Sequence, residues 1–276
     1  MALNPWERLR PHLKLGGPGL LSLSGGSDSS VLLGALIKAG QEIVAVTFAS
    51  PLHPEEELDR AKRLTASLGV EHLILEEDPF SEADFTANPP ERCYLCKRRR
   101  LTVLTKAARD RGIKIVLDGT NASDGRTYRP GLKAAQEFGV ISPFLEAGLD
   151  KEDVWALGDF LGLGDWLHPA SACLATRVAY GQQLTLELLE RIARAEEIVA
   201  KLINAAAGSF RARSHGPLLR LEVQPDKWPQ IFDSRMRIEL LDRLKGLGFN
   251  YVTLDLEGFS SGSMDRAILE VRKNED

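Results

Sequence analysis

A strand-to-helix junction near the N-terminus concentrates groups that bind anions. The stretch Ser24–Ser30 reads SGGSDSS and lies between an apolar run at 20–24 and a helical pattern at 29–40. The first N–H groups of a helix lack intrahelical partners, and the helix dipole adds partial positive charge. Glycines let a ligand approach the backbone, and serine hydroxyls donate further hydrogen bonds. The junction predicts a phosphate-binding loop, although a serine-rich turn with Asp28 as an early helix residue would share part of the pattern.

The loop is not of the common kinase and GTPase type. That pattern, G-x-x-x-x-G-K-[ST], needs a lysine that does not follow Gly25 or Gly26. SGGSDSS instead resembles the S-G-G-x-D-S signature of the PP-loop ATP pyrophosphatases. The resemblance implies a loop that holds the pyrophosphate part of ATP while a substrate oxygen attacks the α-phosphate. It also implies that Asp28 lies in the magnesium–pyrophosphate region, where a hard oxygen ligand is chemically suitable. The expected loop residues are Ser24, Gly25, Gly26, Ser27, Asp28, Ser29 and Ser30.

The three cysteines form a second group with chemical potential. Cys93 and Cys96 make a C-x-x-C pair, and Cys173 lies in the small-residue stretch PASAC. An odd number of cysteines favours metal or redox chemistry over a disulfide framework. The pair could be a thioredoxin-like redox motif, half of a zinc site completed by Cys173 and a histidine such as His168, or two of three thiolate ligands of an iron–sulfur cluster. All three could also be ordinary buried thiols.

Several polar residues are expected to join these groups. Arg177, four residues after Cys173, could lower the pKa of that thiol, which would suit a nucleophile or a metal ligand. The segment DGTNASDG follows an apolar run, so its first residues are expected to face a nucleotide, unless they form only an Asp-Gly turn. The additional residues expected at the nucleotide are Phe48, Asp118, Gly119, Thr120 and Asn121.

Arginines supply the candidate phosphate ligands. Arg129 and Arg177 carry guanidinium groups suited to phosphate or adenylate oxygens, although a lone arginine is often only solvated. Arg211 and Arg213 would point to the same side of an extended segment, as a phosphate clamp or as an ordinary exposed strand edge. Glu222 and Asp255 could bind a hard metal ion, but acidic residues on strands are more often solvated.

The hydrophobic pattern predicts elements that would hold these residues at one edge of a sheet. Strand-length apolar runs alternate with helical patterns, which predicts a parallel sheet covered by helices on both faces. In such α/β folds ligands bind beyond the carboxyl ends of the strands. The predicted strands are 20–24, 42–50, 72–78 and 114–120, and the predicted helices are 29–40, 55–69 and 96–112.

The pattern changes near residue 180. A long amphipathic helix over 184–208 is followed by a strand at 218–224, a helix at 231–248 and a strand at 251–258. We therefore predict a PP-loop domain over 1–180 and a smaller α+β domain over 181–276. The second domain is expected to serve substrate-phosphate binding and oligomerisation.

Composition limits the classes of protein that the chain can belong to. With 35 Lys and Arg against 39 Asp and Glu, the net charge is −4, so no general nucleic-acid-binding surface is expected. The apolar runs are shorter than the roughly 18 residues that span a bilayer. The charged N-terminal stretch lacks the apolar core of a signal peptide, so a cytoplasmic protein is expected.

Five segments together resemble the LarE family: SGGSDSS, ERCYLCK, the block from Asp118 to Val154, PASACLATRVAYG and YVTLDLEGFSSGSM. The resemblance implies an adenine nucleotide α-hydrolase-like, Rossmann-like fold. It implies ATP- and Mg²⁺-dependent sulfur transfer to pyridinium-3,5-biscarboxylic acid mononucleotide, during maturation of the nickel-pincer cofactor of lactate racemase. It also implies a homo-oligomer, with Arg129, Arg211 and Arg213 at the substrate.

Two kinds of sulfur source occur in that family. In one, a single cysteine gives up its own sulfur; in the other, three cysteines hold a [4Fe-4S] cluster that delivers an added sulfide. Cys93, Cys96 and Cys173 match the second kind, and Cys173 would be the donor in the first. The alternatives of another class are a PP-loop tRNA thiolation enzyme, an amidotransferase-type synthetase and a regulatory module without catalysis; no membrane or nucleic-acid partner is expected.

Overall fold

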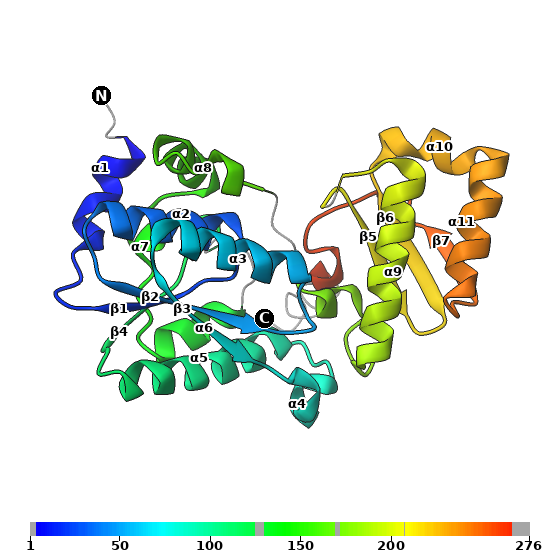
Figure 1. Ribbon diagram of the computed structural model, residues 1–276. Helices are drawn as coiled ribbons and strands as arrows, with labels where there is room; N and C mark the ends of the chain where they lie inside the picture. The colour runs from blue at the N-terminus through cyan, green and yellow to red at the C-terminus, as the bar shows by residue number, and fades with distance from the viewer. Residues whose placement is uncertain (1–3, 125–129, 169–171, 207, 267–276) are drawn as a thin grey trace, which may run out of the picture. The chain divides into compact units, whose positions relative to one another are not determined.

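The computed structural model describes residues 4–124, 130–168, 172–206 and 208–266 (Figure 1). The chain forms two compact units, each built from more than one segment. The first contains Met1–Ser50, Pro54–Asp78 and Cys93–Ala170, and the second contains Pro51–His53, Pro79–Arg92 and Ser171–Asp276. In the described part of the chain, no helix is long and apolar enough to cross a membrane.

The first unit contains the predicted parallel sheet. Its four strands pair in the order β3-β2-β1-β4, and every pair is parallel. Buried apolar residues dominate the two central strands β1 and β2, as expected for a sheet covered on both faces. The strands are β1 (Gly19–Ser22), β2 (Ile43–Ala49), β3 (Glu71–Glu76) and β4 (Ile115–Leu117).

Helices cover both faces of this sheet and form two separate cores. Successive strand residues point to opposite faces, so Leu20 and Leu21 enter different cores. The Leu21 core is filled by α2 (Ser27–Lys38), α3 (Glu55–Leu68) and α8 (Lys151–Phe160) together with N-terminal residues. The Leu20 core is filled by α5 and α6. The first unit also contains α1 (Pro5–Leu9), α5 (Arg92–Asp110), α6 (Pro130–Glu137) and α7 (Pro143–Glu146).

The second unit is built on a three-stranded sheet. Its order is β5-β6-β7, with β5 and β6 antiparallel and β6 and β7 parallel. The predicted helix over 231–248 is interrupted, because the Asp233 side chain accepts hydrogen bonds from the N–H groups of Arg235 and Met236 and starts a new helix. The elements are α4 (Ala83–Thr86), α9 (Leu186–Ile203), β5 (Phe210–His215), β6 (Leu218–Val223), α10 (Trp228–Phe232), α11 (Ser234–Gly246) and β7 (Tyr251–Leu254).

Candidate functional site

The glycine–serine loop has a backbone that only glycine permits. Gly25 has a positive φ of 77°, and a Cβ atom there would lie 2.0 Å from the carbonyl oxygen of Glu57. Gly26 is the N-cap of α2, and no side chain caps this helix end. The loop therefore places the positive end of a helix beyond the carboxyl end of β1 without a side chain covering it. This is the backbone arrangement expected of an anion-binding turn.

The serines of the loop hold its shape. The hydroxyl oxygens of Ser24 and Ser29 lie 3.1 Å apart, and the Ser24 hydroxyl accepts a hydrogen bond from the N–H of Gly26 at 3.2 Å. Ser27 exchanges two hydrogen bonds with the backbone of His168, at 2.7 and 2.9 Å. His168 Nε2 also lies 3.1 Å from the carbonyl oxygen of Gly25. The sequence suggests His168 only as a possible zinc ligand, and its contact with the loop has no local sequence signal.

The segment after β4 lies against the same loop. A Cβ atom on Gly119 would meet the backbone nitrogen of Ser29 at 2.8 Å, so only glycine permits this approach. The side-chain amide of Asn121 donates to Oδ2 of Asp28 at 3.1 Å. The structure thus brings Asp28, Gly119 and Asn121 together at the carboxyl edge of the sheet.

Asp118 anchors this edge to the cysteine-bearing helix. Its side chain accepts hydrogen bonds from Lys97 Nζ at 2.8 Å, from the Ser142 hydroxyl at 2.7 Å and from the N–H of Thr120 at 3.2 Å. Burial acts to raise the pKa of Asp118, but the charge and hydrogen bond of Lys97 and the bonds from Ser142 and Thr120 outweigh it. The pKa is therefore lowered and the carboxylate stays ionised. Sequence reasoning did not single out Lys97.

Phe48, at the end of β2, lies beside an ion-pair cluster. The guanidinium carbon of Arg100 is 5.5 Å from the centroid of the Phe48 ring. The nearly buried carboxylate of Glu77 binds both Arg99 and Arg100. These contacts fix the surroundings of Phe48, and its contact with a nucleotide stays a prediction.

The cysteines occupy the starts of two helical segments. Cys93 and Cys96 lie three residues apart in the first turns of α5, which places both on one face of that helix. Cys173 is the N-cap of a short 3-10 turn over Leu174–Arg177. None of the three is in a disulfide. Within the described residues, no group of three or more His, Cys, Asp or Glu side chains is arranged to hold a metal ion.

Arg177 is buried and holds the Cys173 segment through its backbone. Its guanidinium donates to the carbonyl oxygens of Ala172 at 2.8 Å and Cys173 at 3.3 Å. It also pairs with the Glu196 carboxylate at 2.9 and 3.2 Å. Arg177 therefore fixes this loop, and its predicted effect on the Cys173 thiol stays a prediction.

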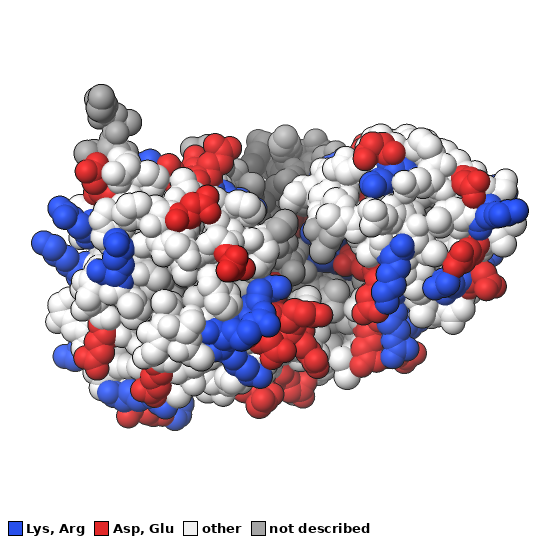
Figure 2. All heavy atoms as spheres, turned by 45° about the horizontal axis from the view of Figure 1, so that its top comes forward, with Lys and Arg blue, Asp and Glu red and all other residues white. Residues whose placement is uncertain are grey.

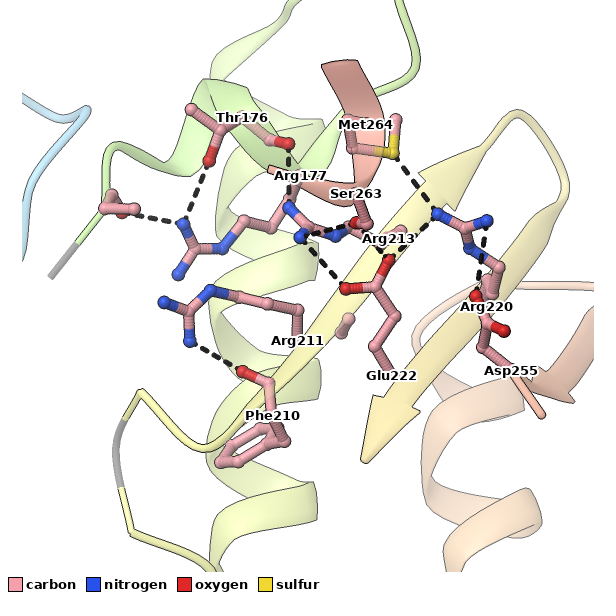
Figure 3. Close-up of polar contacts among 12 residues, drawn as sticks. Thr176, Arg177, Phe210, Arg211, Arg213, Arg220, Glu222, Asp255, Ser263 and Met264 are labelled. Carbon is pink, nitrogen blue, oxygen red and sulfur yellow. Dashed lines mark hydrogen bonds and ion pairs between the residues drawn. The ribbon is translucent and has the colours of Figure 1, made fainter. Parts of the chain in front are cut away.

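Figure 3 shows an arginine-rich cluster in the second unit around β5 and β6. Arg213 bonds to Glu222 at 2.9 Å, to the Ser263 hydroxyl at 3.0 Å and to the carbonyl oxygen of Thr176 at 3.0 Å. Glu222 is 0% exposed and also binds Arg220 at 2.9 Å. The alternative of an exposed strand edge is therefore wrong, because β5 is a buried edge strand whose arginines lie inside the unit. Glu222 is the counter-ion of Arg213 and Arg220.

Arg211 differs from its neighbours because no described carboxylate lies within ion-pair distance of it. Its guanidinium donates to the carbonyl oxygen of Phe210 at 2.6 Å and lies 4.9 Å from the centroid of the Phe259 ring. Burial and then the positive charges of Arg177 and Arg213 lower its pKa to about 10. The side chain is still a cation at neutral pH, and it is suited to an incoming anion. Arg129, the third predicted substrate ligand, lies outside the described residues.

The parallel sheet with an uncapped glycine turn between β1 and α2 defines the first unit as a PP-loop nucleotide-binding domain. The family model of the queuosine biosynthesis protein QueC matches residues 19–88, which include this turn. A tRNA-specific 2-thiouridylase of Brucella ovis is 27% identical over 138 residues, which cover 40% of this chain and 35% of that protein.

Two relatives match almost the whole chain. An uncharacterised protein of Synechocystis is 37% identical over 263 residues, covering 95% of this chain and 97% of that protein. The pyridinium-3,5-bisthiocarboxylic acid mononucleotide synthase of Lactiplantibacillus plantarum is 34% identical over 256 residues, covering 91% of this chain and 90% of that protein. The chain belongs to the LarE family.

Proposed function

We propose that the protein is an ATP-dependent sulfur transferase that converts the carboxylates of pyridinium-3,5-biscarboxylic acid mononucleotide to thiocarboxylates. The observation that carries this proposal is the similarity to the Lactiplantibacillus plantarum synthase over nine-tenths of both chains. The geometry supports it at two places. The Gly25–Gly26 turn suits the pyrophosphate part of ATP, and Arg211 offers a buried cation to the phosphate of a mononucleotide.

The first chemical step would be adenylation. A substrate carboxylate oxygen attacks the α-phosphorus of ATP, the bond to the bridging oxygen breaks, and pyrophosphate leaves with the electron pair. The N–H groups at the start of α2 would stabilise that leaving group. Asp28, with Asn121 bonded to its carboxylate, offers a hard oxygen ligand of the kind that Mg²⁺ prefers.

The second step needs a sulfur nucleophile. Sulfur adds to the acyl carbon and AMP leaves, so that the C–O bond to the adenylate is replaced by a C–S bond. Cys93, Cys96 and Cys173 are thiols outside any disulfide, and this donor set suits a [4Fe-4S] cluster with three cysteine ligands. When bound, such a cluster supplies an iron that can carry an additional sulfide. The alternative keeps the same reaction, with the sulfur atom of Cys173 itself transferred.

The tRNA thiolation alternative is less well supported by the surface charge. The basic run 97–100 on α5 is largely neutralised, because Lys97 pairs with Asp118, and Arg99 and Arg100 pair with Glu77. On the face drawn in Figure 2, acidic and basic side chains are interspersed and form no extended basic surface. An RNA-binding face would need basic groups free to contact phosphates.

The proposal is tested by measuring iron, acid-labile sulfide and ATP-dependent pyrophosphate release after anaerobic reconstitution. We expect about four irons per chain, as in a cubane cluster, and pyrophosphate release that depends on the dicarboxylate mononucleotide. Asp28→Ala should abolish pyrophosphate release, whereas Cys93→Ala should abolish iron binding and retain most adenylation. If iron is absent and Cys173 loses its sulfur after one turnover, Cys173 is the donor. Pyrophosphate release that does not respond to this substrate would refute the proposed reaction.

A further inference from the structure

The peptide group that opens the glycine–serine loop is held by two hydroxyl groups. This peptide joins Leu23 to Ser24, directly after the end of β1. Its carbonyl oxygen accepts a hydrogen bond from the Thr47 hydroxyl at 2.7 Å, and its N–H donates to the Ser29 hydroxyl oxygen at 3.1 Å. Thr47 belongs to β2 and Ser29 to the first turn of α2, and both side chains are buried. Two elements therefore fix the plane of this peptide immediately before Gly25.

A side-chain bond replaces backbone pairing at this point of the sheet. Ser22 with Val46 is the last pair in register between β1 and β2. The N–H of Leu23 still donates to the carbonyl oxygen of Val46 at 2.8 Å, whereas the carbonyl oxygen of Leu23 accepts from the Thr47 side chain. The direction in which the chain leaves the sheet and enters the loop therefore depends on one hydroxyl group.

His72 extends this contact to the edge strand β3. Its Nε2 atom lies 2.8 Å from Oγ1 of Thr47, and its Nδ1 atom lies 3.2 Å from Oγ1 of Thr65. Thr47 lies opposite Ile74 in register, so His72 reaches it across the diagonal of the strand pair. Thr65 belongs to α3, and its hydroxyl also donates to the carbonyl oxygen of Ala61 at 2.9 Å. One hydrogen-bonded chain thus runs from α3 through His72 and Thr47 to the loop, entirely within the first unit.

The carbonyl group of Leu23 determines which ring nitrogen of His72 carries a proton. A carbonyl oxygen only accepts, so the single hydrogen of the Thr47 hydroxyl is used on Leu23. The Thr47 oxygen must then accept from His72, which requires a proton on Nε2. Burial and then the charge of Lys62 lower the pKa of His72, so the ring is neutral at neutral pH and Nδ1 is an acceptor. The Thr65 hydroxyl lies where it can donate to that atom.

We propose that Thr47 and His72 are positioning residues for the nucleotide-binding loop. The His72 ring orients the Thr47 hydroxyl, and this hydroxyl orients the Leu23–Ser24 peptide, so that the N–H groups at the start of α2 face the pyrophosphate part of ATP. Neither side chain has to touch the ligand. This inference rests on the proposed function for the identity of the ligand, whereas the hydrogen-bonded chain does not depend on it.

Two buried threonines allow a matched test of the Thr47 hydroxyl. Thr47→Val and Thr65→Val each remove one hydroxyl from a side chain that is 3% or 2% exposed, but Thr47 bonds to the loop and Thr65 to its own helix. We expect the affinity for ATP, measured by titration calorimetry, to fall roughly tenfold in Thr47→Val, as when one buried hydrogen bond is lost. Thr65→Val should bind ATP as the parent protein does, and Thr47→Ser should restore most of the affinity. Equal ATP affinity in the two valine variants would overturn the inference.

A second pair of variants tests His72. His72→Gln can place an amide N–H near the position of Nε2 and donate to Thr47, whereas His72→Leu has no donor. We expect His72→Leu to weaken ATP binding several-fold and His72→Gln to restore most of it. Thermal unfolding of both variants checks that they are folded to the same extent. An ATP affinity that does not distinguish the two variants would show that the Nε2–H group has no positioning role.

Measurements without ligand separate this inference from the proposed function. Ring ¹⁵N NMR of the parent protein reports the histidine tautomer, and the signal that His72→Gln removes belongs to His72. We expect a proton on Nε2, and faster amide exchange of Ser24 in Thr47→Val than in Thr65→Val. Both results in a protein that releases no pyrophosphate with the dicarboxylate mononucleotide would support the positioning role and reject the proposed reaction. A proton on Nδ1 instead, or equal exchange of Ser24 in the two variants, would overturn the positioning role even in a protein that carries out the reaction.

Discussion

Arg211 and Arg213 lie two residues apart on one strand but have different interaction partners. Arg213 is bound by Glu222, a carboxylate with no exposure to solvent. Arg211 has a backbone carbonyl and an aromatic ring instead. Their shared direction on β5 follows from the period of a strand. We therefore propose that Arg211 binds the substrate and that Arg213 stabilises the fold.

Substitution of the two arginines should separate these roles. Arg211→Met should raise the KM for the dicarboxylate mononucleotide by roughly 10- to 100-fold, the value of a hydrogen bond to a charged group, and leave the KM for ATP unchanged. Among the described residues, Arg213→Met leaves the buried Glu222 carboxylate with the partly exposed Arg220 as its one cationic partner, and it should lower the free energy of unfolding by about 3 kcal/mol. Steady-state kinetics and urea unfolding measure the two effects. A KM effect from Arg213→Met alone would reverse the assignment.

The sequence predicted the direction of these side chains and could not predict their burial. Alternation placed Arg211 and Arg213 on one side, but it did not show that Glu222 on β6 binds Arg213 or that Glu196 on α9 binds the neighbouring Arg177. Arg211 pairs in register with Glu222, whose carboxylate nevertheless binds Arg213. Such a contact depends on how two strands and a helix pack. For this reason Glu196 was not singled out, and Glu222 was considered only as a possible metal ligand.

At the scale of elements, the carboxyl end of β4 is joined to α5 by one buried ion pair. Asp118 accepts from Lys97 at 2.8 Å, and its folded-state pKa is lowered. A lowered pKa means that the pair contributes stability above the unfolded-state pKa of Asp, about 3.9. This contribution is lost as the pH falls from there through the folded-state pKa. The pair therefore stabilises the protein throughout the neutral range.

Lys97→Met should remove this stability and change the acid response. Without the lysine, burial dominates, so the pKa of Asp118 rises and acid unfolding begins at a higher pH. At neutral pH the free energy of unfolding should fall by about 3 kcal/mol, as when one partner of a buried pair is lost. Lys106→Met removes an exposed pair on the same helix and should change little. Identical urea and acid unfolding curves for the two variants would contradict this account of the β4 edge.

Local sequence patterns predicted most of the helices and strands. Apolar runs and helical spacing predicted the four parallel strands and the junction at Ser24–Ser30, because burial on both faces of a sheet leaves a direct hydrophobic signal. The break at Asp233 was not predicted, since a cap inside a continuous amphipathic pattern is decided by one side chain. The contact of His168 with Gly25 was also missed, because it joins residues 143 positions apart.

At the scale of the whole molecule, the chain does not fold as two consecutive segments. Residues 79–92 belong to the second unit, although in the chain they lie between two segments of the first unit, Pro54–Asp78 and Cys93–Ala170. Thr86 accepts from the N–H of Leu184 at 2.8 Å, and Asn88 binds the segment at 179–182. These contacts join parts of the sequence about a hundred residues apart, which hydrophobic periodicity does not register. The second unit is therefore complete only when residues 79–92 and Pro51–His53 are present together with Ser171–Asp276.

This interleaving predicts how fragments will behave. A fragment of 171–276 lacks the partners that Thr86 and Asn88 supply, and each buried polar group left unsatisfied costs about 1–3 kcal/mol. That loss is large compared with the free energy of unfolding of a typical domain, about 5–15 kcal/mol. We expect the fragment to lack a cooperative urea transition, and a version with residues 79–92 fused through a flexible linker to regain one. The same fusion carrying Asn88→Gly should regain less stability, because it lacks the side-chain hydrogen bonds of Asn88 to residues 179 and 182. Its linker and added length are identical, so the difference reports these bonds alone. Equal cooperativity of 171–276 with and without the added segment would show that the second unit folds independently of it.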